Sequence, residues 1–209
     1  MPAFNPSTRE VRFKIVYCGA GYSGKTTNLA YIHSRLDSSR RGDLISLATA
    51  SDRTLFFDFL PVQAVEIAGC RTSFQLYTVP GQAIYNATRQ LVLQGTDGLV
   101  FVVDSSRARL EENVTAWRTM WTNLLDNGDD PWRMPMAIQF NKRDLPDAMP
   151  VAELEALFNP GPARRPTFEA VTQSGWNVFS TLNEVAQSVL KVFFEANQTT
   201  EAGRGLAAG

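Results

Sequence analysis

Residues 11–26 read Val11-Arg12-Phe13-Lys14-Ile15-Val16-Tyr17-Cys18-Gly19-Ala20-Gly21-Tyr22-Ser23-Gly24-Lys25-Thr26. The part through Tyr17 is rich in β-branched and aromatic residues and predicts a strand. Gly19 to Thr26 matches the pattern of Gly, four residues and Gly-Lys-Ser/Thr, and residues 25–36 have the period of a helix. Small residues let backbone N–H groups turn inward around phosphate oxygens, and the helix adds the positive end of its dipole. This strand-loop-helix order predicts a phosphate-binding loop, which we favour over a simple glycine-rich turn.

The last two residues of this loop are expected to bind phosphate and metal. Lys25 is expected to reach the β- and γ-phosphates of a nucleotide and to act in catalysis, and the Thr26 hydroxyl is expected to bind Mg²⁺. We expect the nucleotide to contact the whole loop and the residue after it, that is Gly19, Ala20, Gly21, Tyr22, Ser23, Gly24, Lys25, Thr26 and Thr27.

A second polar loop, Asn141-Lys142-Arg143-Asp144, follows the apolar run from Met136 to Phe140. A doubly wound sheet presents its ligand-binding loops at such strand ends. Asp144 can accept hydrogen bonds from the ring N–H and the exocyclic amine of guanine, a pair of donors that adenine lacks, while Asn141 and Lys142 steady the loop and the base. Four polar residues alone are more often a solvated turn. Their place downstream of a phosphate loop favours the recognition of guanine.

Short β-rich runs alternate with longer helical segments, which is typical of a mostly parallel sheet flanked by helices. We expect further strands at 44–48, 62–68, 73–79, 99–103, 136–140 and 168–171, with 62–68 and 73–79 as an antiparallel hairpin, and further helices at 111–127, 151–158 and 178–196. The sequence therefore predicts an α/β P-loop NTPase fold with one domain over residues 1–196. Residues 197–209 have no apolar pattern, and we expect a disordered tail there.

Composition excludes several functional classes. Of the 209 residues, 20 are Lys or Arg and 21 are Asp or Glu, so no overall positive field attracts nucleic acid. The two cysteines are too few for a disulfide framework or a metal site, which favours the cytoplasm. Apolar runs such as 99–103 are much shorter than the roughly 20 residues of a membrane helix. We also expect no signal peptide and no direct lipid anchor.

The two loops together resemble those of the Ras-like small GTPases, and the residues between them narrow the resemblance. Residues 49–61 read Thr49-Ala50-Ser51-Asp52-Arg53-Thr54-Leu55-Phe56-Phe57-Asp58-Phe59-Leu60-Pro61, and residues 76–82 read Leu76-Tyr77-Thr78-Val79-Pro80-Gly81-Gln82. Both are similar to the MglA (mutual gliding-motility) branch of bacterial small GTPases, over residues 5–191, and this implies a Ras-like G domain. Most Ras-like proteins have Asp at the position of Thr78, so the resemblance also implies that a carboxylate near Mg²⁺ is missing.

The resemblance assigns roles to individual residues. Thr54 would bind Mg²⁺, and the Gly81 N–H would hold the γ-phosphate. Gln82 would orient the attacking water, and Arg53 would be an arginine finger supplied in cis. Without the resemblance, a solvated arginine would be the better interpretation of Arg53. Val171 sits where related proteins present a backbone N–H to the guanine carbonyl.

The function that the resemblance implies is a Mg²⁺-dependent GTPase switch, slow alone, with GTP and GDP as ligands. The implied partners are an MglB-like roadblock-domain activating protein and downstream effectors. The implied setting is cytoplasmic control of cell polarity or motility, with recruitment to a pole or membrane through partners. Two alternatives stay open. One is a GTP-binding scaffold with negligible hydrolysis, because Thr78 and the unusual Ala50-Ser51 alter the switch. The other is an ATP-dependent P-loop enzyme such as a kinase.

Two aromatic clusters have structural and functional interpretations. Residues 55–60 are a nearly continuous apolar run, which suits core packing and a nucleotide-dependent partner surface equally well. Trp117 and Trp121 are spaced i, i+4 on one expected helix, which favours packing over ligand stacking.

Overall fold

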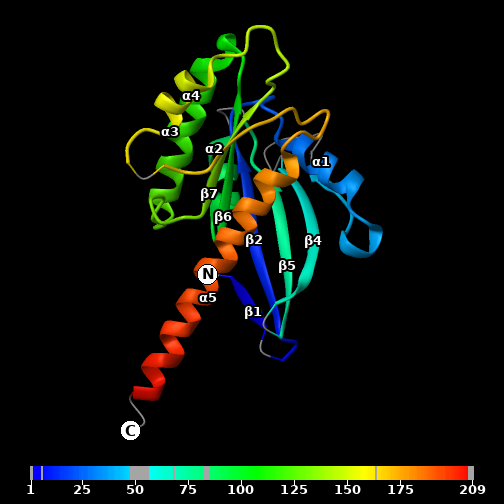
Figure 1. The fold of residues 1–209 in the computed structure, drawn as a ribbon, viewed down its shortest axis with the longest axis vertical. Helices are drawn as coiled ribbons and strands as arrows, with labels where there is room; N and C mark the ends of the chain where they lie inside the picture. The colour runs from blue at the N-terminus through cyan, green and yellow to red at the C-terminus, as the bar shows by residue number, and fades with distance from the viewer. Residues whose placement is uncertain are drawn as a thin grey trace.

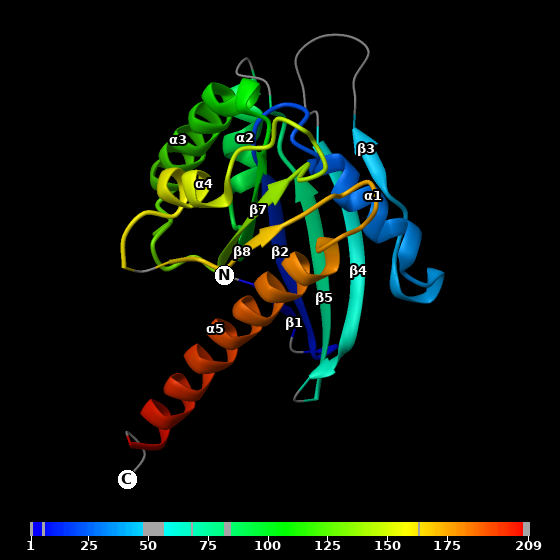
Figure 2. The same ribbon diagram turned by 45° about the horizontal axis from the view of Figure 1, so that its top comes forward.

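The structure, a computed structural model, describes residues 2–5, 7–47, 57–67, 69–81, 85–162 and 164–206. These residues form one eight-stranded sheet with helices on both of its faces (Figure 1, Figure 2). The strands are β1 Ala3–Asn5, β2 Glu10–Cys18, β3 Ile45–Leu47, β4 Phe57–Ile67, β5 Cys70–Thr78, β6 Gly98–Asp104, β7 Met136–Asn141 and β8 Thr167–Glu169. The helices are α1 Lys25–Arg35, α2 Asn86–Leu93, α3 Leu110–Asp126, α4 Val151–Phe158 and α5 Val178–Leu206, with short 3₁₀ turns at Ser38–Arg40 and Arg107–Arg109.

The sheet is mostly parallel. Its strand order is β3-β4-β5-β2-β6-β7-β8, and β1 pairs with β2 outside this path. β5, β2, β6, β7 and β8 run parallel, while β3-β4, β4-β5 and β1-β2 pair antiparallel. The parallel strands therefore bring their carboxyl ends to one edge of the sheet, where an open α/β sheet binds its ligands.

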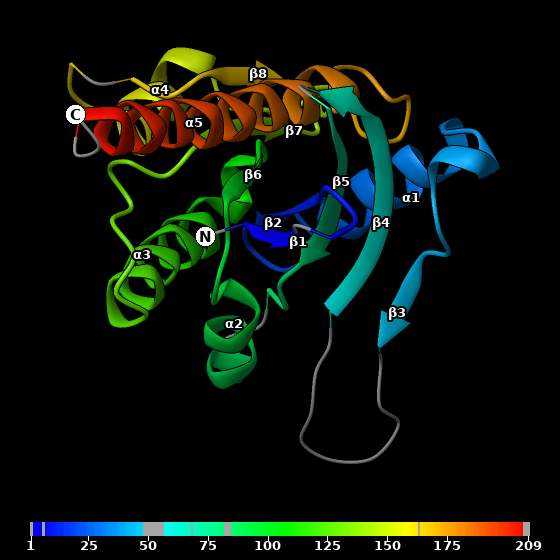
Figure 3. The ribbon, with the colours of Figure 1, turned by 90° about the horizontal axis from the view of Figure 1, so that it is seen from below.

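The two faces of the sheet bury different helices. Alternate residues of β2 face opposite ways, so Phe13, Ile15 and Tyr17 pack with α1 and α5, while Val16 and Cys18 pack with α2, α3 and α4. Figure 3 shows α5 on one side of the sheet and α2 and α3 on the other. β6 is buried along its whole length because both of its faces are covered. The predicted α/β fold class is thus confirmed.

Four elements differ from the sequence-based expectation. The short strand β1 and the helix α2 were not predicted, and β4 begins at Phe57 and not at residue 62. Helix α5 does not end at Ala196 but continues to Leu206, and its end projects beyond the sheet (Figure 1). A helix that has already formed gains one hydrogen bond for each added residue, so this extension needs no apolar stripe. No helix among the described residues is long and apolar enough to cross a membrane.

Candidate functional site

The predicted phosphate loop lies between the end of β2 and the start of α1, at the carboxyl edge of the sheet. Gly19 and Gly24 have positive φ angles of 138° and 107°. A Cβ on Gly19 would lie 2.2 Å from the Val102 carbonyl oxygen, and one on Gly24 would lie 2.2 Å from Asn141 Nδ2. Both the backbone conformation and the close neighbours therefore require glycine at these two positions.

Lys25, the first residue of α1, turns back over the loop. Its Nζ donates to the carbonyl oxygens of Gly19 at 3.0 Å and Ala20 at 2.6 Å. The side chain is buried, and this burial lowers the pKa of Lys25 to about 8, while the nearby Asp58 carboxylate opposes the shift. The ammonium group thus lies at the centre of the loop on neutral acceptors, where an anionic phosphate would be a stronger partner.

A buried carboxylate from β4 faces the start of α1. Asp58 Oδ2 accepts hydrogen bonds from Thr26 Oγ1 at 2.6 Å and from Thr78 Oγ1 at 2.8 Å, and Asp58 Oδ1 accepts one from Ser46 Oγ at 2.6 Å. The Asp58 N–H donates in turn to Thr78 Oγ1 at 2.8 Å. Thr78 therefore helps to hold Asp58 beside Thr26. The resemblance implies that the usual carboxylate at the end of β5 is missing, and the structure places a different carboxylate, from β4, beside Thr26.

A cavity of about 580 Å³ opens in front of the loop. Its lining includes Thr26 and Thr27 from α1, Asp58 from β4, and Thr78 and Gly81 from the end of β5 and the segment after it. Ligand pockets in proteins span about 300–1,000 Å³, so the space suits a nucleotide's phosphates. The loop residues expected to contact the nucleotide line this cavity except for Gly19, Ala20 and Ser23.

Gly81 lies directly against the phosphate loop. A Cβ on Gly81 would be 2.3 Å from the Gly21 nitrogen and 2.6 Å from the Ala20 carbonyl carbon. Such a separation is too short for any side chain, so glycine is required for this approach. The resemblance assigns the γ-phosphate to the neighbourhood of Gly21 and Gly81, and the structure brings these two residues together.

Asn141, at the end of β7, connects the phosphate loop to the predicted guanine-binding loop. Its Nδ2 donates to the Ser23 carbonyl oxygen at 2.8 Å and to Thr172 Oγ1 at 3.1 Å. Its Oδ1 accepts from the Thr172 N–H at 3.1 Å. The side chain is 1% exposed, so these bonds are shielded from water. One buried amide therefore joins three loops that are distant in the sequence.

In the rest of the predicted guanine-binding loop, Lys142 and Arg143 are fixed by contacts within the fold, whereas Asp144 is exposed. Lys142 has a positive φ of 64°, and its Nζ donates to the buried Asp104 carboxylate at 2.6 Å. Arg143 Nε donates to Glu169 Oε2 at 2.9 Å. Asp144 follows these anchored residues and is exposed. Its carboxylate is therefore free of burial and accessible to a base.

The Val171 backbone forms hydrogen bonds within the loop that follows β8. The Val171 N–H donates to the Trp176 carbonyl oxygen at 3.3 Å, and the Val171 carbonyl accepts from Ser174 and Gly175. The resemblance implies a bond from this N–H to guanine, but the structure gives the N–H a long bond inside the loop. A base carbonyl would have to compete for it.

Three predicted site residues, Arg53, Thr54 and Gln82, lie outside the described residues. The apolar run at 55–60 is described only from Phe57 onward. Phe57 and Phe59 pack on Tyr77 with ring centroids 5.9 and 4.8 Å away, while Leu60 is fully buried. This part of the run therefore packs within the fold.

Sequence reasoning missed three contacts of the site. Besides Asp58, these are the ion pair from Asp104 to Lys142 and a hydrogen bond from Arg109 Nη2 to the Gly21 carbonyl at 3.0 Å. Asp58 carries a signal that could have found it, because an ionisable residue within an apolar strand must have polar partners. Arg109 carries none, since its contact spans 88 residues of sequence.

Comparison with known proteins agrees with this geometry. Residues 4–193 match the ADP-ribosylation factor family. The chain is 48% identical over 190 residues to the mutual gliding-motility protein MglA of Myxococcus xanthus (strain DK1622), covering 91% of this chain and 96% of that protein. It is 23% identical to the Ras-related protein Rab7 of Pisum sativum, with 89% and 86% covered. It is 36% identical over 93 residues to ADP-ribosylation factor-like protein 4D of Mus musculus, with 44% of each covered.

Both the family match and the MglA relative extend over nearly the whole chain, through the phosphate loop and the guanine-binding loop alike. The chain therefore belongs to the ADP-ribosylation factor family of small GTPases and is a homologue of the mutual gliding-motility protein MglA.

Proposed function

We propose that this protein is a Mg²⁺-dependent GTPase that alternates between GTP-bound and GDP-bound forms and binds partners according to the nucleotide. The observation that supports this most directly is the buried Asn141, which ties the guanine-binding loop to Ser23 of the phosphate loop at 2.8 Å. The base and the phosphates would then bind to one connected site. Loss of the γ-phosphate would release the segment at Gly81, which lies beside Gly21.

Guanine selectivity is assigned to Asp144. Its exposed carboxylate accepts from the ring N–H and the amine of guanine, and adenine would leave it without these donors. Lys142 is tied to Asp104, which holds the loop in place beneath the base.

The residues around Thr26 fit a Mg²⁺ ion. Mg²⁺ prefers oxygen ligands and is commonly held by one or two carboxylates together with substrate phosphates. Thr26 Oγ1 and the Asp58 carboxylate supply such oxygens within one hydrogen-bonded group. We assign Thr26 and Thr54 as direct ligands and Asp58 as the carboxylate that orients Thr26. The ion, when bound, would neutralise charge on the β- and γ-phosphates.

Hydrolysis is assigned to residues of the same chain. Lys25 would stabilise charge on the transferred phosphoryl group, Gln82 would orient the water, and Arg53 would complete the charge stabilisation. Gln82 follows Gly81 directly in the sequence, and Gly81 touches the phosphate loop. An activating partner would therefore need only to position groups that the chain already has.

The relative's name points to the wider role. We propose that nucleotide-dependent binding to an MglB-like roadblock-domain activator and to effectors controls cell polarity or gliding motility. The protein would work in the cytoplasm and reach a pole or membrane through those partners.

Replacing the guanine-reading carboxylate tests the nucleotide assignment. Asp144→Ala should reduce affinity for a fluorescent GDP analogue by at least about tenfold, because two hydrogen bonds to a charged acceptor are lost. Competition by ATP should remain as weak as in the wild type. Asp126→Ala, which removes an exposed carboxylate at the end of α3, is the matched control and should bind normally. Equal GDP affinity in both variants would contradict the assignment.

Single-turnover measurements separate a switch from a scaffold. Protein loaded with GTP should release phosphate slowly alone and faster with a roadblock-domain partner, whereas a GTP-binding scaffold would release none in either case. The scaffold remains the second candidate because Thr78 replaces the usual carboxylate of that strand. Preference for ATP over GTP in the binding assay would instead support a kinase-like enzyme.

A further inference from the structure

A groove lies on the α3 and α4 side of the molecule, away from the phosphate cavity. We name it the tryptophan groove, and its volume is about 340 Å³. It is lined by Trp117 and Trp121 from α3, by Phe158 from α4, and by Trp132 and Arg165 from the flanking loops. These side chains come from four separate parts of the chain, so the groove is a product of the fold.

The aromatic rings of the groove are only partly used by the core. Trp117 packs on the buried Phe101, with ring centroids 4.7 Å apart, and this contact confirms the packing role predicted for it. Trp121 instead packs on Trp132 at 4.7 Å, and Trp132 is 73% exposed. Trp121 Nε1 is buried, and no described residue accepts a hydrogen bond from it. The outer half of the aromatic stack thus presents the apolar ring surface of Trp132.

Arginines give the groove a positive charge. The Arg165 guanidinium lies 5.1 Å from the Trp121 ring centroid and 5.7 Å from that of Trp132, and its Nη2 donates to the Pro131 carbonyl at 3.1 Å. Partial burial of the Arg165 guanidinium lowers its pKa. Arg118 lines the groove from the exposed side of α3 and forms no ion pair with any described residue.

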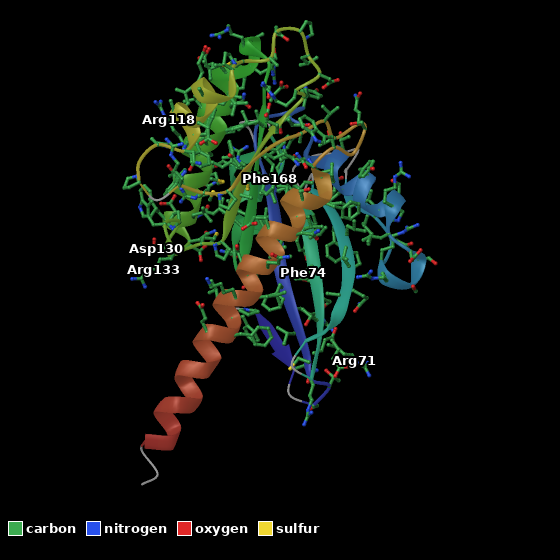
Figure 4. All side chains as sticks on the ribbon, in the orientation of Figure 1. Arg71, Phe74, Arg118, Asp130, Arg133 and Phe168 are labelled. Atoms are coloured by element: carbon green, nitrogen blue, oxygen red, sulfur yellow. The ribbon has the colours of Figure 1, made fainter. Side chains whose placement is uncertain are left out.

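The charge around the groove is not balanced by acids in its wall. Of the described residues that line it, two are arginines and none is Asp or Glu. The exposed Arg133, on the same side of the molecule as Arg118, is not in the lining and is paired with Asp130 at 3.5 Å, so it adds no unbalanced charge (Figure 4). A bound cation would be repelled here, and an acidic ligand would be attracted.

We propose that the tryptophan groove binds an acidic, proline-containing segment of another protein in the polyproline II conformation. Such a segment has no internal hydrogen bonds, so its carbonyl oxygens are available to the guanidinium N–H groups of the exposed Arg118. Its proline rings stack on aromatic walls, as in other grooves of this kind. Acidic side chains beside the prolines pair with Arg118 and Arg165. A recess between two helices suits a chain better than it suits a membrane surface.

This interaction should not depend on the nucleotide. Arg109 contacts Gly21 just before the start of α3, while Trp117 and Trp121 lie in the later turns of that helix, roughly 10–20 Å along its axis at 1.5 Å per residue. The groove residues also lie outside the lining of the phosphate cavity. The partner bound here is therefore retained in both nucleotide states.

The test uses the full chain and a fluorescein-labelled peptide of repeated Glu-Pro-Pro, followed by anisotropy. Saturable binding is expected with both GDP and a non-hydrolysable GTP analogue. Trp132→Ala and, separately, Arg118→Glu should each weaken it by about tenfold or more, as expected for an aromatic anchor and a charged contact. Leu125→Ala, an exposed apolar change on the same helix, and Arg40→Glu, an exposed charge reversal elsewhere, are the matched controls.

Two further peptides and a membrane arm make the result decisive. Repeated Glu-Gly-Ser tests acidity without proline, repeated Lys-Pro-Pro tests proline without acidity, and phosphatidylserine vesicles test a lipid surface. No saturation up to about 1 mM, equal binding of the basic peptide, or binding to vesicles alone would overturn the proposal. Arg118 is exposed, so its variant keeps the test valid even if loss of Trp132 disturbs the fold. GDP binding by each variant verifies folding.

Discussion

At the scale of single residues, Asp58 of β4 provides a carboxylate beside Thr26. Thr78 occupies the position where most Ras-like proteins have Asp, and its hydroxyl holds Asp58 of the neighbouring strand at 2.8 Å. The carboxylate still reaches Thr26 at 2.6 Å. The sequence of β5 alone does not indicate this carboxylate, because it is placed by the pairing of β5 with β4.

Removing that charge should weaken the metal site and leave the base site intact. In Asp58→Asn, Mg²⁺ affinity in the GDP complex should fall by about 10–100-fold, as is typical when a group that orients a metal ligand is lost. The rate of release of a fluorescent GDP analogue, titrated with Mg²⁺, measures this. Asp43→Asn, an exposed carboxylate outside the site, is the control. A wild-type Mg²⁺ dependence in Asp58→Asn would remove Asp58 from the metal site.

The two cysteines should differ sharply in reactivity. Burial raises the pKa of the Cys18 thiol to about 12, whereas Cys70 is only partly buried. The reactive species is the thiolate, so Cys18 should stay protonated and unreactive as the pH rises from 7 to 9. A chromogenic disulfide reagent should find one thiol in the folded protein and two after denaturation in guanidinium. Fast modification of Cys70→Ser in its native state would contradict this prediction.

At the scale of elements, the sequence predicted those that rest on local pattern. The strand, glycine loop and helix over residues 11–36 form one continuous signal, and β6 is apolar throughout because both of its faces are covered. The three-residue β1 is too short for a periodic signal. The predicted strand began too late, at residue 62, because the first residues of β4 include Asp58, whose partners come from α1, β3 and β5.

The predicted site residues also divide into those set by local sequence and those set by distant contacts. Phosphate-loop residues are neighbours in sequence and can be recognised together. Asp58 and Arg109 meet their partners across 32 and 88 residues, so only the assembled sheet defines those contacts. Arg53, Thr54 and Gln82 rest on resemblance alone and stay predictions.

Helix α5 divides into a packed part and a projecting part. Val189 is buried, and Phe193 stacks edge-on against Phe13 at 5.4 Å. Ending the chain after Ala196 keeps both contacts, so the melting temperature should change by less than about 2 °C. Phe193→Ala, the contrasting variant, should lower stability by about 2 kcal/mol through lost apolar burial. A large loss of stability on truncation would show that residues 197–206 contribute to the fold.

At the scale of the whole molecule, bound nucleotide should stabilise the folded protein. A ligand that binds only the folded state at about 100 times its Kd adds about 2.7 kcal/mol of stability. In a chain of this length, GDP with Mg²⁺ should therefore raise the melting temperature by about 5–10 °C. ATP at the same concentration should give no comparable shift. Scanning calorimetry of nucleotide-free protein with each ligand makes the comparison, and equal shifts would contradict guanine selectivity.

The Asn141 amide also has a consequence for the order of events during synthesis. Its bond to Ser23 closes a separation of 118 residues. Contacts of such length form late, because the intervening chain must first be ordered. A growing chain that has released only its amino-terminal half would expose a complete phosphate loop with no means of telling guanine from adenine. On the proposed assignment of Asp144, selectivity for guanine should therefore appear only after the fold has been completed.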